Sequence, residues 1–164
     1  MESDGASNNE RLLAAARSDN EEMLLEVFEE GGFDINFQDG LGNTALHYSA
    51  SKGYVELMEH VLSHEDCDVD PINRLEGATP LHLAVQIDEP ELREHVVESL
   101  LEAGADTSIR DKNGDTVLDI VPVQDVKIRE LIRKSQAQNS ISKDDVVRED
   151  DDDSAGSDTG SDDD

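Results

Sequence analysis

Three short stretches of this chain repeat with nearly constant spacing. They read G-N-T-A-L-H at residues 42–47, G-A-T-P-L-H at residues 77–82 and G-D-T-V-L-D at residues 114–119, and their glycines lie 35 and 37 residues apart. A period of this length indicates supersecondary units that bury their apolar faces only by stacking on one another. The sequence therefore predicts a stack of repeats, which offers a groove for binding rather than a catalytic pocket.

The first unit has the helical pattern of a repeat that lacks a hairpin in front of it. Ser7 and Glu10 form a capping-box pattern that predicts a helix start, and the glycines at 31 and 32 predict the end of a second helix. Between these signals lie apolar residues spaced for one helical face: Leu12, Leu13, Ala15, Ala16, Met23, Leu24, Val27 and Phe28. Residues 7–38 are therefore predicted to form an N-terminal capping repeat, preceded by a flexible segment at residues 1–6.

The other repeats are predicted at about residues 39–73, 74–110 and 111–134, each opening with a hairpin finger. In the last of them Pro122 is expected to end the first helix early, because proline has no N–H to donate and crowds the preceding turn. Asp125 is expected to cap a final amphipathic helix that closes the repeat.

Two motifs identify the chain as a member of a known family. The T-P-L-H stretch at residues 79–82 and the L-L-E-A-G-A-D stretch at residues 100–106 resemble the consensus of ankyrin repeats. The resemblance covers residues 7–134 and implies an all-α repeat fold, an ankyrin solenoid of about four helix-turn-helix repeats with short β-hairpin fingers. Within the family, the chain resembles a small fungal member with an acidic C-terminal tail.

The resemblance implies a structural role for the histidine of the repeated motif. In the family this histidine and the threonine before it hydrogen-bond the backbone that joins hairpin to helix. His47 and His82 are therefore expected to be structural rather than catalytic. Asp119 stands in the equivalent place of the last repeat, and this departure leaves the geometry of that finger open.

The resemblance also implies a binding surface on the concave side, made of hairpin tips and the exposed face of each first helix. The corresponding positions are Gly40, Leu41, Asn43, Ser51, Lys52, Leu75, Glu76, Ala78, Gln86, Ile87, Lys112, Asn113 and Asp115. Leu41, Leu75 and Ile87 are apolar at positions expected to face solvent. Each is either a buried hairpin contact or an anchor for a protein partner.

Charge limits the kinds of partner. The chain carries 41 acidic and 13 basic residues, a formal net charge of −28. Residues 135–164 hold 11 acids and 2 bases, which leaves a net charge of −19 on residues 1–134. Such a charge repels nucleic acid and anionic membranes and attracts basic proteins.

Residues 135–164 are predicted to be a disordered acidic tail, because the segment lacks the apolar residues needed to offset ordering entropy. Its acidic runs are Glu149, Asp150, Asp151, Asp152 and Asp153, followed by Asp162, Asp163 and Asp164. The tail either only solubilises the chain or captures a basic protein as a mobile polyanion. Ser142, Thr159 and Ser161 each precede an acidic residue by three positions, which is typical of sites for acidophilic kinases.

The sequence indicates no catalytic residue, metal or cofactor. His60, His64 and Cys67 suggest metal ligands, but a zinc site normally needs four ligands and the nearest fourth candidate is a carboxylate. Signatures of hydrolases, P-loop enzymes and dinucleotide-binding enzymes are missing from the sequence. A single cysteine and the lack of a secretory signal fit the cytosol or nucleus, and we expect a monomer.

These features predict a non-catalytic protein–protein interaction module. One hypothesis is an escort or chaperone of a basic protein, such as a ribosomal protein or a histone. It has a parallel in small ankyrin chaperones of ribosomal proteins, whose architecture also joins a short repeat stack to an acidic extension. The alternative is an adaptor subunit in a larger complex, such as a ubiquitin or proteasome assembly, with a merely solubilising tail.

Overall fold

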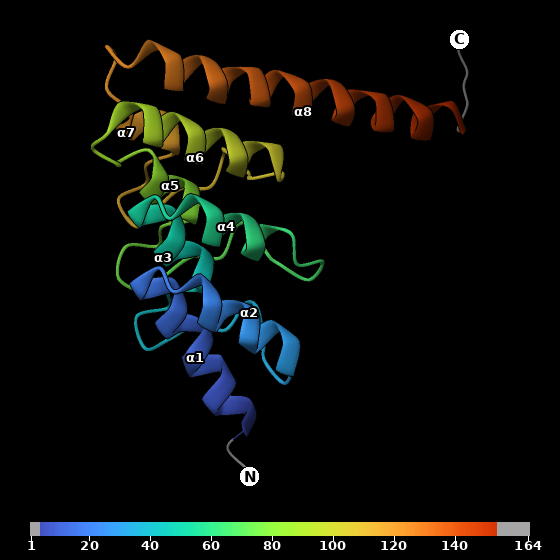
Figure 1. Cartoon of the computed structure of the whole chain (residues 1–164). Coiled ribbons are helices and arrows are strands. Elements are labelled where there is room, and N and C mark those ends of the chain that lie inside the picture. The colour runs from blue at the N-terminus through green and yellow to red at the C-terminus, as the bar shows by residue number, and fades with distance from the viewer. Residues whose placement is uncertain (1–3, 154–164) are drawn as a thin grey trace.

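A computed structural model describes residues 4–153 of the chain, with side chains described for residues 8–140. Within residues 4–153 the chain forms eight helices and no strand, which confirms the all-α repeat fold (Figure 1). The helices stack in pairs from the N-terminus to the C-terminus, the first of each pair being the inner helix and the second the outer helix. They are α1 (Asp4–Ser18) with α2 (Glu21–Glu30), α3 (Ala45–Lys52) with α4 (Val55–Leu62), α5 (Pro80–Ala84) with α6 (Pro90–Glu102), and α7 (Val117–Ile120) with α8 (Val126–Asp153).

Local signals in the sequence set the ends of these helices. Thr44 and Thr79 cap α3 and α5, and each side chain accepts a hydrogen bond from the backbone N–H three residues later. Gly31 follows α2 with a φ of 76°, a backbone conformation that glycine adopts at no steric cost. α7 ends at Ile120, two residues before Pro122, as the sequence predicts.

Each finger is a tight turn rather than a pair of strands. The first turn closes with a 2.9 Å hydrogen bond from the Gly42 N–H to the Asp39 carbonyl. Successive fingers are joined by single backbone hydrogen bonds, from Arg74 N–H to the Leu41 carbonyl (2.8 Å) and from Lys112 N–H to the Glu76 carbonyl (2.9 Å). The fingers at residues 38–43, 73–78 and 111–116 therefore form one connected row along the stack.

The core is a continuous cluster that runs through all four helix pairs. Its largest fully buried side chains are Leu12, Leu24, Leu46, Leu57, Met58, Leu81, Leu100, Ile128 and Ile132. Since inner helices contact the inner helices of neighbouring repeats, each repeat buries its apolar face against the next one.

The helices at the two ends are longer than the sequence predicts. α1 begins at Asp4, so Ser7 lies inside the helix rather than at its start, and part of the segment expected to be flexible is helical. α8 continues past Lys134, where the sequence predicts its end, as far as Asp153. The stretch from Val126 to Asp153 contains neither glycine nor proline, so nothing in its backbone interrupts the helix. None of the described helices is long and apolar enough to cross a membrane.

Candidate protein-binding surface

We define the finger surface as the three fingers together with the solvent-facing sides of α3 and α5 and the loop that follows α5 at residues 85–89. It contains the positions that the sequence proposes for partner binding. Eight of those are exposed: Gly40, Leu41, Lys52, Leu75, Glu76, Gln86, Lys112 and Asn113. Three are partly buried, namely Asn43, Ser51 and Asp115.

Two of the predicted positions, Ala78 and Ile87, are buried and do not offer a side chain to a partner. Ala78 is 3% exposed, and its carbonyl accepts a 2.9 Å hydrogen bond from His47. Ile87 is 8% exposed, packs into the core, and its carbonyl accepts a 2.6 Å hydrogen bond from Arg93. The long loop after α5 turns Ile87 inward, a position that the family alignment had placed at the surface.

The other two apolar positions differ from Ile87. Leu41 is 55% exposed and Leu75 is 72% exposed, and both lie on fingers. Ile72, which the sequence did not single out, is also exposed just before the second finger, and its carbonyl accepts a hydrogen bond from the Gln38 side chain. Large apolar side chains therefore face solvent on two neighbouring fingers.

The first finger is held in shape by the carboxylate of Asp39. It accepts hydrogen bonds from the N–H groups of Leu41 and Asn43, both 3.0 Å, and from the Tyr48 hydroxyl on α3. Partial burial raises the pKa of Asp39, but these hydrogen bonds outweigh it and hold the pKa below its ordinary value. The Arg17 guanidinium lies 5.5 Å from the centre of the Tyr48 ring, so α1 also contacts this assembly.

His47 links one repeat to the next. Its Nδ1 accepts a 3.1 Å hydrogen bond from the Thr44 N–H, so the proton sits on Nε2, which donates to the Ala78 carbonyl of the following finger at 2.9 Å. Burial holds the pKa of His47 below its ordinary value, which favours this neutral form. The structural role implied for this histidine by the family is visible in these contacts.

His82 makes the same two contacts in the next repeat, and Asp119 makes the first of them in the last repeat. His82 accepts from the Thr79 N–H at 3.2 Å and donates to the Asp115 carbonyl at 3.0 Å. Asp119 keeps the first contact, accepting from the Thr116 N–H at 2.9 Å. A carboxylate cannot donate onward, but the part of the chain that the structure describes has no further finger after it, so the departure from the motif does not disturb the last finger.

Charge is distributed unevenly between the two sides of the stack. The outer helices α2, α4 and α6 carry five, two and four glutamates, against a single arginine, Arg93. That arginine is neutralised by Asp125 at 3.0 Å. On the second and third fingertips, by contrast, the exposed charged side chains are Arg74, Glu76 and Lys112. The outer helices therefore carry a net charge of −10, about half of the −19 on residues 1–134, whereas the exposed charges of the second and third fingertips sum to +1.

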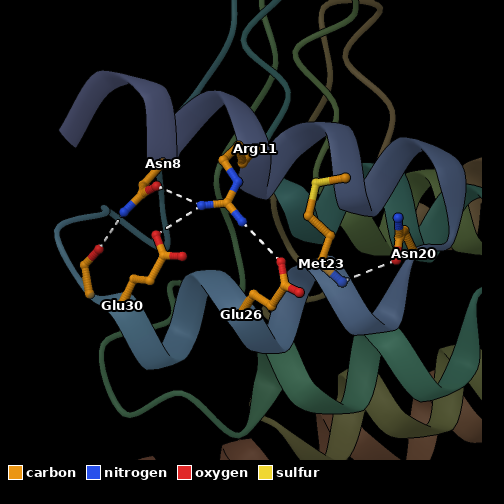
Figure 2. Close-up of polar contacts among 7 residues, drawn as sticks. Asn8, Arg11, Asn20, Met23, Glu26 and Glu30 are labelled. Carbon is orange, nitrogen blue, oxygen red and sulfur yellow. Dashed lines mark hydrogen bonds and ion pairs between the residues drawn. The ribbon is translucent and has the colours of Figure 1, made fainter. Parts of the chain in front are cut away.

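The N-terminal pair is fastened by polar contacts between its two helices, as Figure 2 shows. Arg11 of α1 reaches across to Glu30 at 2.8 Å and to Glu26 at 3.1 Å on α2. Asn8 donates to the Gly31 carbonyl at 2.8 Å and so covers the end of α2. These contacts stabilise a repeat that has no preceding finger.

A hollow that the sequence did not indicate lies beside α1. Its volume is about 680 Å³, and it lies between the open side of α1 and the first finger. Its lining includes Leu13, Ala14, Arg17, Met23, Phe37 and Gly40. The absence of a finger before the first repeat was the sequence signal that could have indicated it.

The residues that suggested a metal site are not brought together. His60 pairs with Glu21 at 2.6 Å, whereas the His64 ring lies edge-on to Phe28 and Phe33. Cys67 is partly buried, and burial raises the pKa of its thiol to about 11. Among the residues that the structure describes, no three histidine, cysteine or carboxylate side chains are grouped to hold a metal ion.

The proposed tail residues fall into two groups. Ser142 and the acidic run from Glu149 to Asp153 lie in the last part of α8, where side chains are not described. Thr159, Ser161 and the acidic run from Asp162 to Asp164 lie outside the described residues. Capture of a partner and phosphorylation at these positions stay predictions.

Known proteins match most of the repeat region of this chain. The family description of ankyrin repeats in three copies matches residues 12–111. The chain is 36% identical over 132 residues to ankyrin repeat-containing protein YGL242C of Saccharomyces cerevisiae, an alignment that covers 74% of this chain and 73% of that protein. It is 33% identical over 109 residues to the E3 ubiquitin-protein ligase Ufd4 of Drosophila melanogaster, and 35% identical over 109 residues to the nuclear factor NF-kappa-B p105 subunit of Gallus gallus.

The last two alignments cover 66% and 63% of this chain but only 4% and 11% of those much longer proteins. The yeast protein, by contrast, matches over most of its length, as expected from the resemblance to a small fungal member. Together with the stacked helix pairs, the finger row and the threonine–histidine contacts, these matches show that the chain belongs to the ankyrin repeat family.

Proposed function

We propose that this protein is a non-catalytic escort of a basic protein, such as a ribosomal protein or a histone, in the cytosol or nucleus. The finger surface supplies specific contacts, and the acidic outer helices and C-terminal segment supply long-range attraction. The observation that carries the proposal is the eleven glutamates of α2, α4 and α6, opposed by one neutralised arginine.

Long-range charge and the finger surface contribute differently to binding. A net charge of −28 raises the rate at which a basic partner meets the chain, and this effect weakens as salt screens the charge. Charge alone does not select one basic protein among many. Selection needs a shaped contact surface with exposed apolar anchors, and the fingers offer such anchors at Leu41 and Leu75.

A second candidate function is that of an adaptor subunit whose partner is not basic. Two observations favour it. The exposed charges of the second and third fingertips include two cations, and two relatives whose short matching segments align with this chain are E3 ubiquitin-protein ligases. In this case the acidic C-terminal segment serves only solubility.

Affinity purification of the tagged full-length chain from its native cells, at low and at high salt, separates these candidates. The escort function predicts one strongly basic protein that is retained at low salt and lost at high salt. Capture of this basic protein should weaken when the acidic runs are made neutral. The substitutions are Glu149→Gln and Asn in place of Asp150, Asp151, Asp152, Asp153, Asp162, Asp163 and Asp164. A set of neutral partners that resists salt and ignores these substitutions would identify an adaptor instead.

A further inference from the structure

We propose that the fingers bind a partner segment that combines apolar and acidic side chains. The site is the fingertip ridge, defined as Leu41, Ile72, Arg74, Leu75 and Lys112. This proposal rests on the proposed role of the finger surface in protein binding, and it holds whether or not the protein captured by the outer helices is basic.

The ridge is built before any ligand arrives. Leu41 and Arg74 are joined through the 2.8 Å backbone hydrogen bond between the first two fingers, and Glu76 and Lys112 through the 2.9 Å bond between the second and third. A site whose backbone is already fixed loses little conformational entropy when it binds. The exposed Leu41, Ile72 and Leu75 then offer apolar area along a short row.

The cations of the ridge are not neutralised by the protein itself. Within residues 8–140, the side chains of Arg74 and Lys112 have no hydrogen bond or ion pair, whereas Arg11, Arg93 and Lys127 each pair with a carboxylate. The outward-facing charges of the second and third fingertips therefore leave an excess of one positive charge, set against −28 for the chain.

The nearby carboxylates of Asp111 and Asp115 are also charged, but they are partly buried, whereas Arg74 and Lys112 are exposed. Asp111 accepts backbone hydrogen bonds from Asn113 at 2.9 Å and Asp115 at 3.0 Å, in the same way as Asp39 in the first finger. Asp39 and Asp111 point into their own turns, so the outermost charges that a ligand meets on the second and third fingertips are those of Arg74, Glu76 and Lys112. A basic segment laid on the leucines would meet Arg74 and Lys112, whereas an acidic one would pair with them.

Residues 154–164 of this chain do not match the ligand that the ridge requires, and we place the ligand on another protein. Residues 154–164 read S-A-G-S-D-T-G-S-D-D-D and contain acids but no large apolar side chain. They could pair with the cations of the ridge but could not cover its leucines. The chemistry that fits the whole ridge is a segment with leucine-like side chains next to aspartate or glutamate.

Selection of random dodecapeptides displayed on phage, with the full-length chain as bait, tests this chemistry directly. The enriched peptides are expected to carry more acids than bases and at least one large apolar residue. Their affinities are then measured by fluorescence polarisation for Leu75→Ser and for the double variant Arg74→Glu with Lys112→Glu. Each variant should bind about tenfold more weakly or worse than the native chain.

Matched controls change the same chemistry elsewhere. Val123→Ser removes an exposed apolar side chain away from the fingers, and Arg133→Glu with Lys134→Glu makes the same change of charge on α8. Both should alter binding less than about twofold, since exposed groups outside a site contribute little. Circular dichroism confirms that all variants keep their helices.

Three results would overturn the proposal: enrichment of basic peptides, no enrichment at all, or equal losses in ridge and control variants. Each of these can be told apart from failure of the escort function. That function fails when no basic protein is retained from cells, and such a failure leaves the outcome of the peptide selection unaffected.

Discussion

The two motif histidines have the same local contacts but unequal surroundings, so their removal should have unequal costs. His47→Ala leaves the Thr44 N–H without a partner, and the Ala78 carbonyl keeps only its 3.0 Å hydrogen bond from the Asn73 N–H. Thr44 and Ala78 are both almost fully buried, so water cannot replace either lost contact. His82→Ala also leaves a buried donor, the Thr79 N–H, but its other partner is the carbonyl of Asp115, a residue that is only half-buried and open to water.

An unsatisfied buried N–H costs about 1–3 kcal/mol and a lost buried hydrogen bond about 1 kcal/mol, so His47→Ala should lower the free energy of unfolding by about 2–4 kcal/mol and His82→Ala by about 1–3 kcal/mol. Small domains are stable by about 5–15 kcal/mol, so both losses are measurable. The assay is urea unfolding followed by circular dichroism at the helix band. With slopes of about 1–3 kcal/mol per molar urea, the two midpoints should differ by about 0.5 M.

His95→Ala is the matched control, because this histidine is exposed and its Nε2 lies 3.9 Å from Glu59. Its unfolding midpoint should stay close to that of the native chain. Equal midpoints for His47→Ala and His82→Ala, or a larger loss for His82→Ala, would refute the reasoning that burial of the inter-repeat acceptor sets the cost.

Three further predictions follow from individual contacts. An alanine in the left-handed conformation costs ~1 kcal/mol, and Gly42→Ala should cost well over this amount, because a Cβ there would lie 2.6 Å from the Arg74 nitrogen. Gly114→Ala has open space around its Cβ and should cost only the left-handed strain. Urea unfolding of the two variants measures the difference. Arg93→Ala leaves Asp125 mostly buried and unpaired, so thermal unfolding should show a loss of about 2–4 kcal/mol, and an unchanged midpoint would contradict it. Burial lowers the pKa of His47 in the fold, so the unfolded chain binds more protons than the folded chain once the pH falls below the ordinary histidine pKa of 6.5. The stability that neutral His47 contributes should therefore be present above pH 6.5 and be lost as the pH falls. His47→Gln should flatten this dependence in unfolding curves recorded from pH 7 to 5.

The sequence predicted the repeats well because the chemistry of the repeat is local. Thr44 caps its own helix, Pro122 ends α7, and each finger closes within a few residues, so the signal and the structure lie in the same stretch of chain. The fold class and the order of the elements therefore follow from the pattern of motifs.

The surface was harder to predict because it depends on contacts between distant residues. Ile87 looked like a surface position by alignment, but the long loop after α5 turns it into the core. Ile72 was missed because it precedes the repeated motif, and its place beside the first finger depends on contacts between distant residues, such as that of its carbonyl with Gln38. The division of charge between outer helices and fingers also became visible only once the helices were placed.

The ends of the chain show the limit of apolar patterns as a guide to helix length. Beyond Lys134 the amphipathic pattern fades, and the sequence predicts disorder on that ground. α8 runs to Asp153, because its first turns pack on α6 and the stretch that follows contains neither glycine nor proline to interrupt it. Disorder of the tail stays a prediction. Apolar patterning indicates which part of a helix packs, and it does not fix where the helix ends.

The central claim is that the fingers and inner helices, rather than the outer helices, make the specific contacts with a protein partner. Backbone amide NMR spectra of the isotope-labelled full-length chain, recorded while the partner retained from cells is added, test this claim most directly. We predict the largest shifts in the fingers at residues 38–43, 73–78 and 111–116. Shifts confined to α2, α4 and α6, with the finger amides unchanged, would contradict it.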